Sequence, residues 1–203
     1  MLSTTEAIVL ALQPLSDRAH LLHVYTRTGG RVNCKVYGLG RRHAAGLYTP
    51  FSLIQLTGDF QLSTLNSQLS TVRTAQLLYV PTTTTTDMRK QAVAMFLSEV
   101  LYLTLRHPMP DEPMFDFLAD AVRQLDATDQ PQNFHLSFLV AFAAQLGFAM
   151  SDISNPLISN PLTLTTSRSA RQEQLRALCA YFAEHVDAWQ PPKSLDILME
   201  VFD

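Results

Sequence analysis

The sequence predicts an α+β fold, in which a small closed β-barrel is followed by an all-helical domain. Short β-branched and aromatic runs fill residues 1–80, and apolar residues at helical spacing follow residue 87. Residues 1–80 hold seven Lys/Arg and three Asp/Glu, a net charge of +4, whereas residues 81–203 hold eight and fifteen, a net charge of −7. We therefore expect the two parts to meet different partners, with a polyanion for the basic one.

The first 80 residues are predicted to form one domain of five strands. Turn residues separate these strands, which are expected at 6–13, 20–27, 31–37, 51–57 and 68–78. The pair Gly29–Gly30 predicts a tight hairpin turn between the second and third strands, because glycine accepts positive φ angles. Five short strands without an intervening helix favour a closed barrel over an open sheet.

Residues 81–86 are predicted to be a linker made of Pro81 and five threonines. We expect the last threonines to cap the next helix, while a phosphorylated or glycosylated segment is the alternative. An all-helical domain is then predicted over 87–203, with helices at about 87–105, 111–126, 131–146, 169–189 and 194–202. An uncharged Asn-Pro loop is expected between the third and fourth of them.

Composition argues against a membrane protein and against a secreted one. No apolar stretch reaches the roughly 20 residues of a membrane span. Met1 is followed by polar residues, without the basic and apolar segments of a secretory signal. Cys34 and Cys179 lie far apart in the sequence and are expected to be reduced thiols. These features predict a cytoplasmic location.

Signals for catalysis or for a bound metal are poor, and we expect no catalytic residue, cofactor or metal. The sequence lacks a Gly-x-Ser-x-Gly nucleophile motif and a Walker phosphate loop. Gly38 and Gly40 begin a segment like a dinucleotide loop, but His43 stands at the third glycine position. His20 and His23 lie three apart in a predicted strand, so they face opposite sides and cannot share a metal.

Strand alternation indicates a nucleic-acid surface on the barrel. In the third strand Val32, Cys34 and Val36 fall on one face, opposite a face with cations and a phenol ring. His23 and Tyr25 lie on the corresponding face of the second strand. Cations follow phosphates and aromatic rings stack on bases, as in proteins that bind single strands. The predicted DNA-binding residues are Arg27, Arg31, Lys35, Tyr37, Arg41 and Arg42. An ordinary solvated barrel exterior is the alternative.

These motifs resemble those of the RecO family of DNA repair proteins. The resemblance spans nearly the whole chain in order, although each motif alone is weak. It rests on Ile8-Val9-Leu10, Asp17-Arg18, Tyr25-Thr26-Arg27-Thr28-Gly29-Gly30-Arg31, Gly38-Leu39-Gly40-Arg41-Arg42, Pro50-Phe51-Ser52-Leu53, Leu146-Gly147-Phe148 and Lys193-Ser194-Leu195 with Leu198 and Phe202.

The resemblance implies an N-terminal OB-fold, a helical remainder and a nucleoid-associated protein that binds and anneals single-stranded DNA. It further implies help in loading RecA onto strands coated by single-strand binding protein, with RecR as the usual partner. The family's basic DNA-binding residues correspond here to Arg27, Arg31, Lys35, Arg41 and Arg42. An OB-fold adaptor that binds proteins and not DNA is the competing interpretation.

Two expectations concern the helical domain. Many members of the family carry a four-cysteine zinc module after the Leu-Gly-Phe segment, but residues 152–166 contain no cysteine, so we expect no zinc here. The resemblance also implies a pocket for the acidic, apolar-ended tail of single-strand binding protein. Cations that could line its rim are Arg89, Lys90, Arg106 and Arg123. Solvation of helix ends is an equally good interpretation of these four residues.

Overall fold

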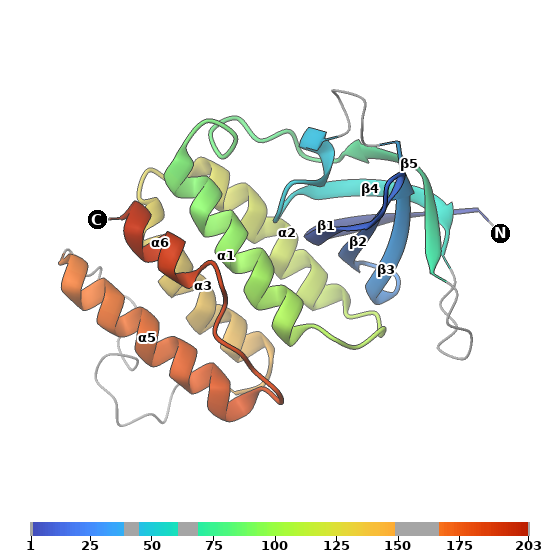
Figure 1. The fold of residues 1–203 in the computed structure, drawn as a ribbon. Helices are drawn as coiled ribbons and strands as arrows, with labels where there is room; N and C mark the ends of the chain where they lie inside the picture. The colour runs from blue at the N-terminus through green and yellow to red at the C-terminus, as the bar shows by residue number, and fades with distance from the viewer. Residues whose placement is uncertain (1, 39–44, 61–68, 149–166, 203) are drawn as a thin grey trace. The chain divides into compact units, whose positions relative to one another are not determined.

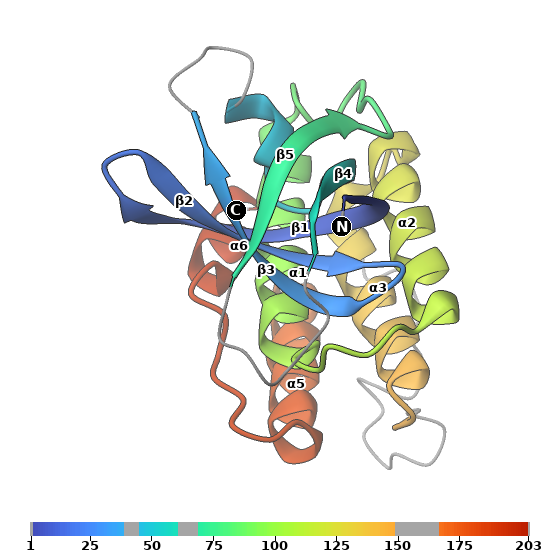
Figure 2. The same cartoon turned by 90° about the vertical axis from the view of Figure 1, so that its right-hand side faces the viewer.

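The computed structural model describes residues 2–38, 45–60, 69–148 and 167–202, and begins with a closed five-stranded barrel (Figures 1 and 2). The strands are β1 (Ser3–Ser16), β2 (Ala19–Thr26), β3 (Gly30–Tyr37), β4 (Leu53–Asp59) and β5 (Ser70–Leu77), with a short helix η1 (Ala45–Tyr48) before β4. Their order around the barrel is β1-β2-β3-β5-β4. The predicted OB-fold is confirmed.

The strand pairing explains how the barrel closes. β1 pairs antiparallel with β2 and β4, and β3 and β4 pair antiparallel with β2 and β5 respectively. The last contact, between β3 and β5, is parallel and joins Cys34 to Ser70 and Lys35 to Thr71. Because β3 and β5 run in the same direction, the ends of both strands that follow these pairs lie on the same side of the barrel.

The barrel core follows the predicted alternation of β3. Val32, Cys34 and Val36 are buried, while Asn33 and Tyr37 between and beyond them are exposed. Burial raises the pKa of the Cys34 thiol to about 12, so this cysteine stays protonated and acts as a small apolar residue. The core consists of Ala7, Val9, Leu22, Val24, Val32, Cys34, Val36, Tyr48, Ile54, Leu56 and Val72.

The turn between β2 and β3 confirms the role predicted for the glycine pair. Gly30 has a φ of 62°, a left-handed conformation that other residues rarely adopt. A Cβ atom at this position would also collide with the backbone of Met109, which packs against the turn. Glycine is therefore required here for two separate reasons.

The helices agree with the predicted ranges to within a few residues. They are α1 (Met88–Thr104), α2 (Glu112–Ala127), α3 (Pro131–Gln145), α5 (Arg168–His185) and α6 (Leu195–Val201) (Figure 1). The Asn-Pro loop predicted between α3 and α5 falls within 149–166, outside the described residues. Within the described ranges, no helix has the length and apolar character that crossing a membrane requires.

The chain divides into two compact units, and each includes part of α1. The first contains residues 1–82 together with 98–124, so that the last turns of α1 and most of α2 belong with the barrel. The second contains residues 83–97 together with 125–203. The domain division proposed from the sequence, with a barrel domain at 1–80, a linker at 81–86 and a helical domain at 87–203, stays a prediction.

The threonine segment is part of the folded structure of the second unit. The buried carboxylate of Asp126 accepts hydrogen bonds from the backbone N–H groups of Thr83 and Thr84, at 2.8 and 2.7 Å. Lys90 donates to the backbone carbonyl oxygen of Asp126 at 2.6 Å. The expectation that the last threonines cap α1 is wrong, since the Asp87 carboxylate accepts from the N–H of Arg89 at 2.9 Å.

Candidate nucleic-acid interface

Arg27, the first of the predicted DNA-binding residues, is surrounded by carboxylates. Its guanidinium pairs with Glu6 at 2.8 Å, with Asp116 of α2 at 2.8 Å and with Glu112 of α2 at 3.5 Å. It also lies 4.5 Å from the ring centre of Phe115. Burial lowers the pKa of Arg27, but hydrogen bonds and charge attraction from Glu6 and Asp116 outweigh burial and raise the pKa overall. The charge of Arg27 is thus balanced within the protein and joins α2 to the barrel.

Arg31 is engaged by the end of α1. Its guanidinium donates to the carbonyl oxygens of Tyr102 and Leu105 at 3.2 and 3.3 Å and lies 4.2 Å from the ring centre of Tyr102. The last carbonyls of a helix lack intrahelical partners and carry partial negative charge. Arg31 therefore satisfies the carboxyl end of α1, which places it inside the barrel unit rather than on an open face.

The outer face of β2 is also covered. His23 and Tyr25 are only 5% and 3% exposed, and the His23 ring meets Tyr102 edge to face at a centroid distance of 5.0 Å. Burial lowers the pKa of His23, and burial together with the charge of Asp111 raises the pKa of Tyr25 to about 12. The predicted orientation of these side chains is correct, but the interpretation of β2 as an open stacking face is wrong, because residues of the 98–124 segment lie over it.

Lys35 and Tyr37 of β3 are the predicted residues that the structure leaves open. Tyr37 is 57% exposed, and Lys35 is partly exposed. The Lys35 ammonium forms no ion pair or hydrogen bond with the rest of the described chain. Arg41 and Arg42 follow Tyr37 by four and five residues and lie outside the described residues. Among the described residues, Arg27 and Arg31 thus bind other parts of the protein, whereas Lys35 and Tyr37 do not.

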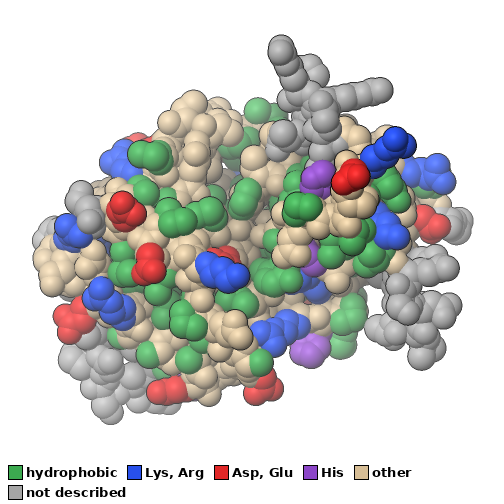
Figure 3. All heavy atoms as spheres, viewed as in Figure 1, with side chains coloured by type: hydrophobic (Ala, Val, Ile, Leu, Met, Phe, Trp, Pro, Cys, Tyr) green, Lys and Arg blue, Asp and Glu red, His purple; other side chains and the backbone are tan. Residues whose placement is uncertain are grey.

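On the face drawn in Figure 3, Lys and Arg side chains lie over the strands and over the helices. Several blue side chains lie over the strands on its right-hand side, interspersed with an acid and a histidine. Other blue side chains lie among acids over the helices. The cations that matter for a polyanion are therefore identified by which of them lack an acidic partner, and not by their number.

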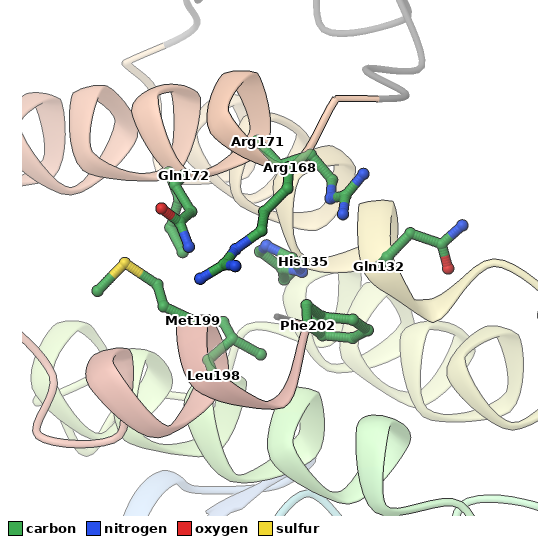
Figure 4. Close-up of a pocket in the computed structure, with 9 residues that line it drawn as sticks. Gln132, His135, Arg168, Arg171, Gln172, Leu198, Met199 and Phe202 are labelled. Atoms are coloured by element: carbon green, nitrogen blue, oxygen red, sulfur yellow. The ribbon is translucent and has the colours of Figure 1, made fainter.

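A pocket in the second unit is a separate candidate site. It lies between α5 and α6 with α3 behind them, and Arg168 and Arg171 of α5 border it (Figure 4). The buried His135 ring lines it, and the ring atom Nδ1 has no hydrogen-bond partner in the described residues. Burial lowers the pKa of His135 to about 3, so the ring is neutral. The lining residues are Gln132, His135, Arg168, Arg171, Gln172, Leu175, Leu198, Met199 and Phe202.

The four cations expected at the rim of a tail pocket do not line this one. Arg89 and Arg123 pair with Asp87 and Asp120, at 2.9 and 3.0 Å. Lys90 is only 5% exposed and donates to the backbone carbonyl oxygen of Asp126. Arg106 donates to the carbonyl oxygen of Leu103 at 2.7 Å. Arg168 and Arg171 are not among the cations predicted from the sequence. Their spacing of three along α5, with Leu175 next on the same side, was the available signal.

Metal binding has no support in the geometry of the described residues. Over 2–38, 45–60, 69–148 and 167–202, no three His, Cys, Asp or Glu side chains come together in a way that could hold an ion. The segment 152–166, from which the absence of zinc was predicted, lies outside these ranges. That prediction stays open.

Comparison with known proteins gives a consistent result along the chain. The family model for the N-terminal part of recombination protein O matches residues 1–80, and the model for its C-terminal part matches residues 85–152. The DNA repair protein RecO of Phocaeicola vulgatus is 34% identical over 72% of this chain, a match that spans only 61% of that protein's length. The RecO proteins of Flavobacterium johnsoniae and Bacteroides fragilis are 27% and 26% identical, over 98% and 100% of both chains. With its OB-fold barrel followed by helices, the chain belongs to the RecO family.

Proposed function

We propose that this protein is a DNA-binding and strand-annealing mediator of recombinational DNA repair, without enzymatic activity of its own. In this role it helps to load RecA onto single strands coated by single-strand binding protein, and it acts with RecR in the cytoplasm at the nucleoid. Family membership supports the repair role. The observation that carries DNA binding is the open pair Lys35 and Tyr37, on the outer face of an OB-fold barrel.

The chemistry of this pair suits a single strand of any sequence. A lysine without an acidic partner can replace the counterions of a phosphate, and an exposed tyrosine ring can stack on any base. Arg41 and Arg42 add two cations to the segment that leaves β3 just after Tyr37. Lys35, Tyr37, Arg41 and Arg42 contact DNA in this proposal, while Arg27 and Arg31 support the site by holding residues 98–124 against the barrel.

A labelled single strand of mixed sequence, titrated at about 50 and about 200 mM salt, tests DNA binding. Contact with three to five phosphates gives a slope of log affinity against log salt of about −2 to −4. The double variant Arg41→Gln/Arg42→Gln weakens binding to all sequences alike and brings the slope about 1.4 units closer to zero, since two contacts are removed.

The matched control is Arg123→Gln/Arg176→Gln, which removes two cations from the helices and leaves binding unchanged. Salt-independent or absent binding by the wild-type chain would remove the proposal in favour of a protein-binding adaptor. Wild-type affinity in a folded Arg41→Gln/Arg42→Gln protein would place the DNA elsewhere.

We assign the tail of single-strand binding protein to the pocket of α3, α5 and α6. An acidic tail with an apolar last residue needs cations at the entrance and apolar side chains inside. Arg168 and Arg171 supply the first, and Leu175, Leu198 and Phe202 supply the second. The neutral, buried ring of His135 adds an unsatisfied nitrogen that a carboxylic acid or peptide N–H group could meet.

Titration of a tail peptide into the full chain tests the pocket. Arg168→Glu/Arg171→Glu is expected to weaken binding at least about tenfold, since two charge-assisted contacts become repulsive. Arg176→Glu, which changes an exposed arginine of the same helix, leaves the affinity unchanged. A peptide without its apolar last residue should bind as weakly as the double variant does. Equal binding by the wild type and Arg168→Glu/Arg171→Glu contradicts the assignment.

A further inference from the structure

The parallel contact between β3 and β5 creates an outward surface that is separate from the covered face of β2. Lys35 pairs with Thr71, so both side chains point to the same side of the sheet, away from the buried pair Cys34 and Ser70. Two residues further along the parallel strands come Tyr37 and Arg73. Figure 2 shows β5 passing on the near side of the barrel beside β3.

Arg73 lies at a β-bulge of β5 and faces outward together with the next residue. On β4 the neighbours Gly58 and Thr57 pair with Val72 and Thr74 of β5, so Arg73 is the extra residue between these two pairs. Val72 is buried, whereas Arg73 and Thr74 are both exposed. A regular strand would have alternated inward and outward through this stretch, and the extra residue allows two successive side chains to face solvent.

Arg73 has no competing partner among the residues that the structure describes. Its guanidinium forms no ion pair or hydrogen bond with the described part of the chain, in contrast to the three carboxylates at Arg27. Lys35 on the neighbouring strand likewise forms no ion pair or hydrogen bond with the described part of the chain. Asp59 of β4, opposite Thr71, is the acid that borders this surface on the β4 side. Two cations and the 57% exposed ring of Tyr37 therefore lie on one pair of strands.

We propose that single-stranded DNA crosses the barrel along the β3–β5 pair, with Arg73 as a phosphate contact and the Tyr37 ring as a stacking platform for a base. This inference rests on the proposed DNA binding and adds the path and a residue to it. The alternative path along β2 and β3 is closed, because His23 and Tyr25 are buried and Arg27 and Arg31 bind carboxylates and carbonyl oxygens. Lys35, paired with Thr71, belongs to the same path.

Single substitutions in the full chain test the path with the same labelled strand. Arg73→Gln removes one phosphate contact, so affinity at low salt falls several-fold and the salt slope moves about 0.7 closer to zero. Tyr37→Ala removes a stacked base and weakens binding about tenfold with an unchanged slope, whereas Tyr37→Phe keeps the ring and the affinity. Arg18→Gln, an exposed arginine between β1 and β2, is the matched control and changes nothing.

The midpoint temperature of thermal unfolding is measured for each variant. We expect it to equal that of the wild type, because substitutions at exposed positions change stability little. If the wild type binds with salt dependence while Arg73→Gln and Tyr37→Ala bind equally well, the β3–β5 path is wrong and the proposed function stands. If Tyr37→Phe weakens binding as much as Tyr37→Ala, the contact is a hydroxyl hydrogen bond and the stacking role is wrong. A wild-type protein that does not bind the strand removes both the path and the proposed function.

Discussion

Arg31 and Lys35 lie on the same side of β3, four residues apart, and have different surroundings. The Arg31 guanidinium binds the last carbonyls of α1 and stacks on Tyr102, while the Lys35 ammonium binds nothing in the described chain. Strand alternation placed both side chains outward, but it does not state what covers them. A cation that fixes a helix end serves folding, and a cation that faces solvent is available to a ligand.

Substitution of Arg31 separates these two roles. Arg31→Ala leaves the carboxyl end of α1 unsatisfied and is expected to cost about 2–4 kcal/mol of unfolding free energy. Arg31→Lys recovers only part of it, because an ammonium lacks the planar fork that reaches both carbonyls. Urea unfolding monitored by far-UV circular dichroism measures the loss. Lys35→Ala, the control, shifts the free energy by about 0.5 kcal/mol or less.

A different pattern would show that Arg31 contacts DNA directly. An Arg31→Ala protein with wild-type stability and lost DNA affinity contradicts the structural role. Reduced stability with DNA affinity retained below the unfolding transition supports it.

At the scale of elements, α1 explains why part of the chain is easy to predict and part is not. Its apolar residues do not keep to one narrow face, and a helix with this pattern is buried on more than one side. The structure agrees, since Val93, Phe96 and Leu97 are buried in one compact unit and Val100 and Leu101 in the other. The helical spacing of apolar residues predicted the helix. It did not predict that the two ends of the helix belong to different compact units.

α3 carries a histidine that makes stability depend on pH. His135 is fully buried between the rings of Phe96 and Phe202, and its pKa falls to about 3. The folded protein therefore keeps the ring neutral, while the unfolded chain takes up a proton below its ordinary pKa of about 6.5. The stabilising contribution is complete above pH 6.5 and is lost as the pH falls towards 3, at about 1.4 kcal/mol per pH unit.

The variant His135→Phe tests this dependence. Between pH 7 and pH 5 the wild type is expected to lose about 2 kcal/mol of unfolding free energy because His135 is protonated only in the unfolded chain. The variant lacks this group and is expected to lose about 2 kcal/mol less over the same range. Urea unfolding at the two pH values gives both numbers. His185→Phe, which replaces an exposed histidine of α5, should leave the wild-type pH dependence intact. Parallel pH profiles for the wild type and His135→Phe would show that another group governs acid unfolding.

At the scale of the whole molecule, the distribution of charge changes once the compact units are known. The unit built on the barrel contains nine Lys/Arg and eight Asp/Glu, a net charge of +1, and the other contains six and ten, a net charge of −4. The contrast of +4 and −7 between the two halves of the sequence is thus smaller between folded units. Because salt screens exposed charges beyond about 10 Å at 0.1 M, the local environment of each cation decides whether it binds a phosphate.

The sequence by itself determined the elements, the barrel and the family. Alternating apolar residues, the glycine turn and helical spacing are local properties of the sequence. They predict each strand and helix because each element buries one face. Only the tertiary structure decided which outward residues remain accessible. Arg27 and Arg31 acquire partners more than 70 residues away in the sequence, from Tyr102 to Asp116, and the bulge that leaves both Arg73 and Thr74 exposed is set by the pairing of β5 with β4. Such partners are set by packing between distant segments, a property that no local pattern encodes.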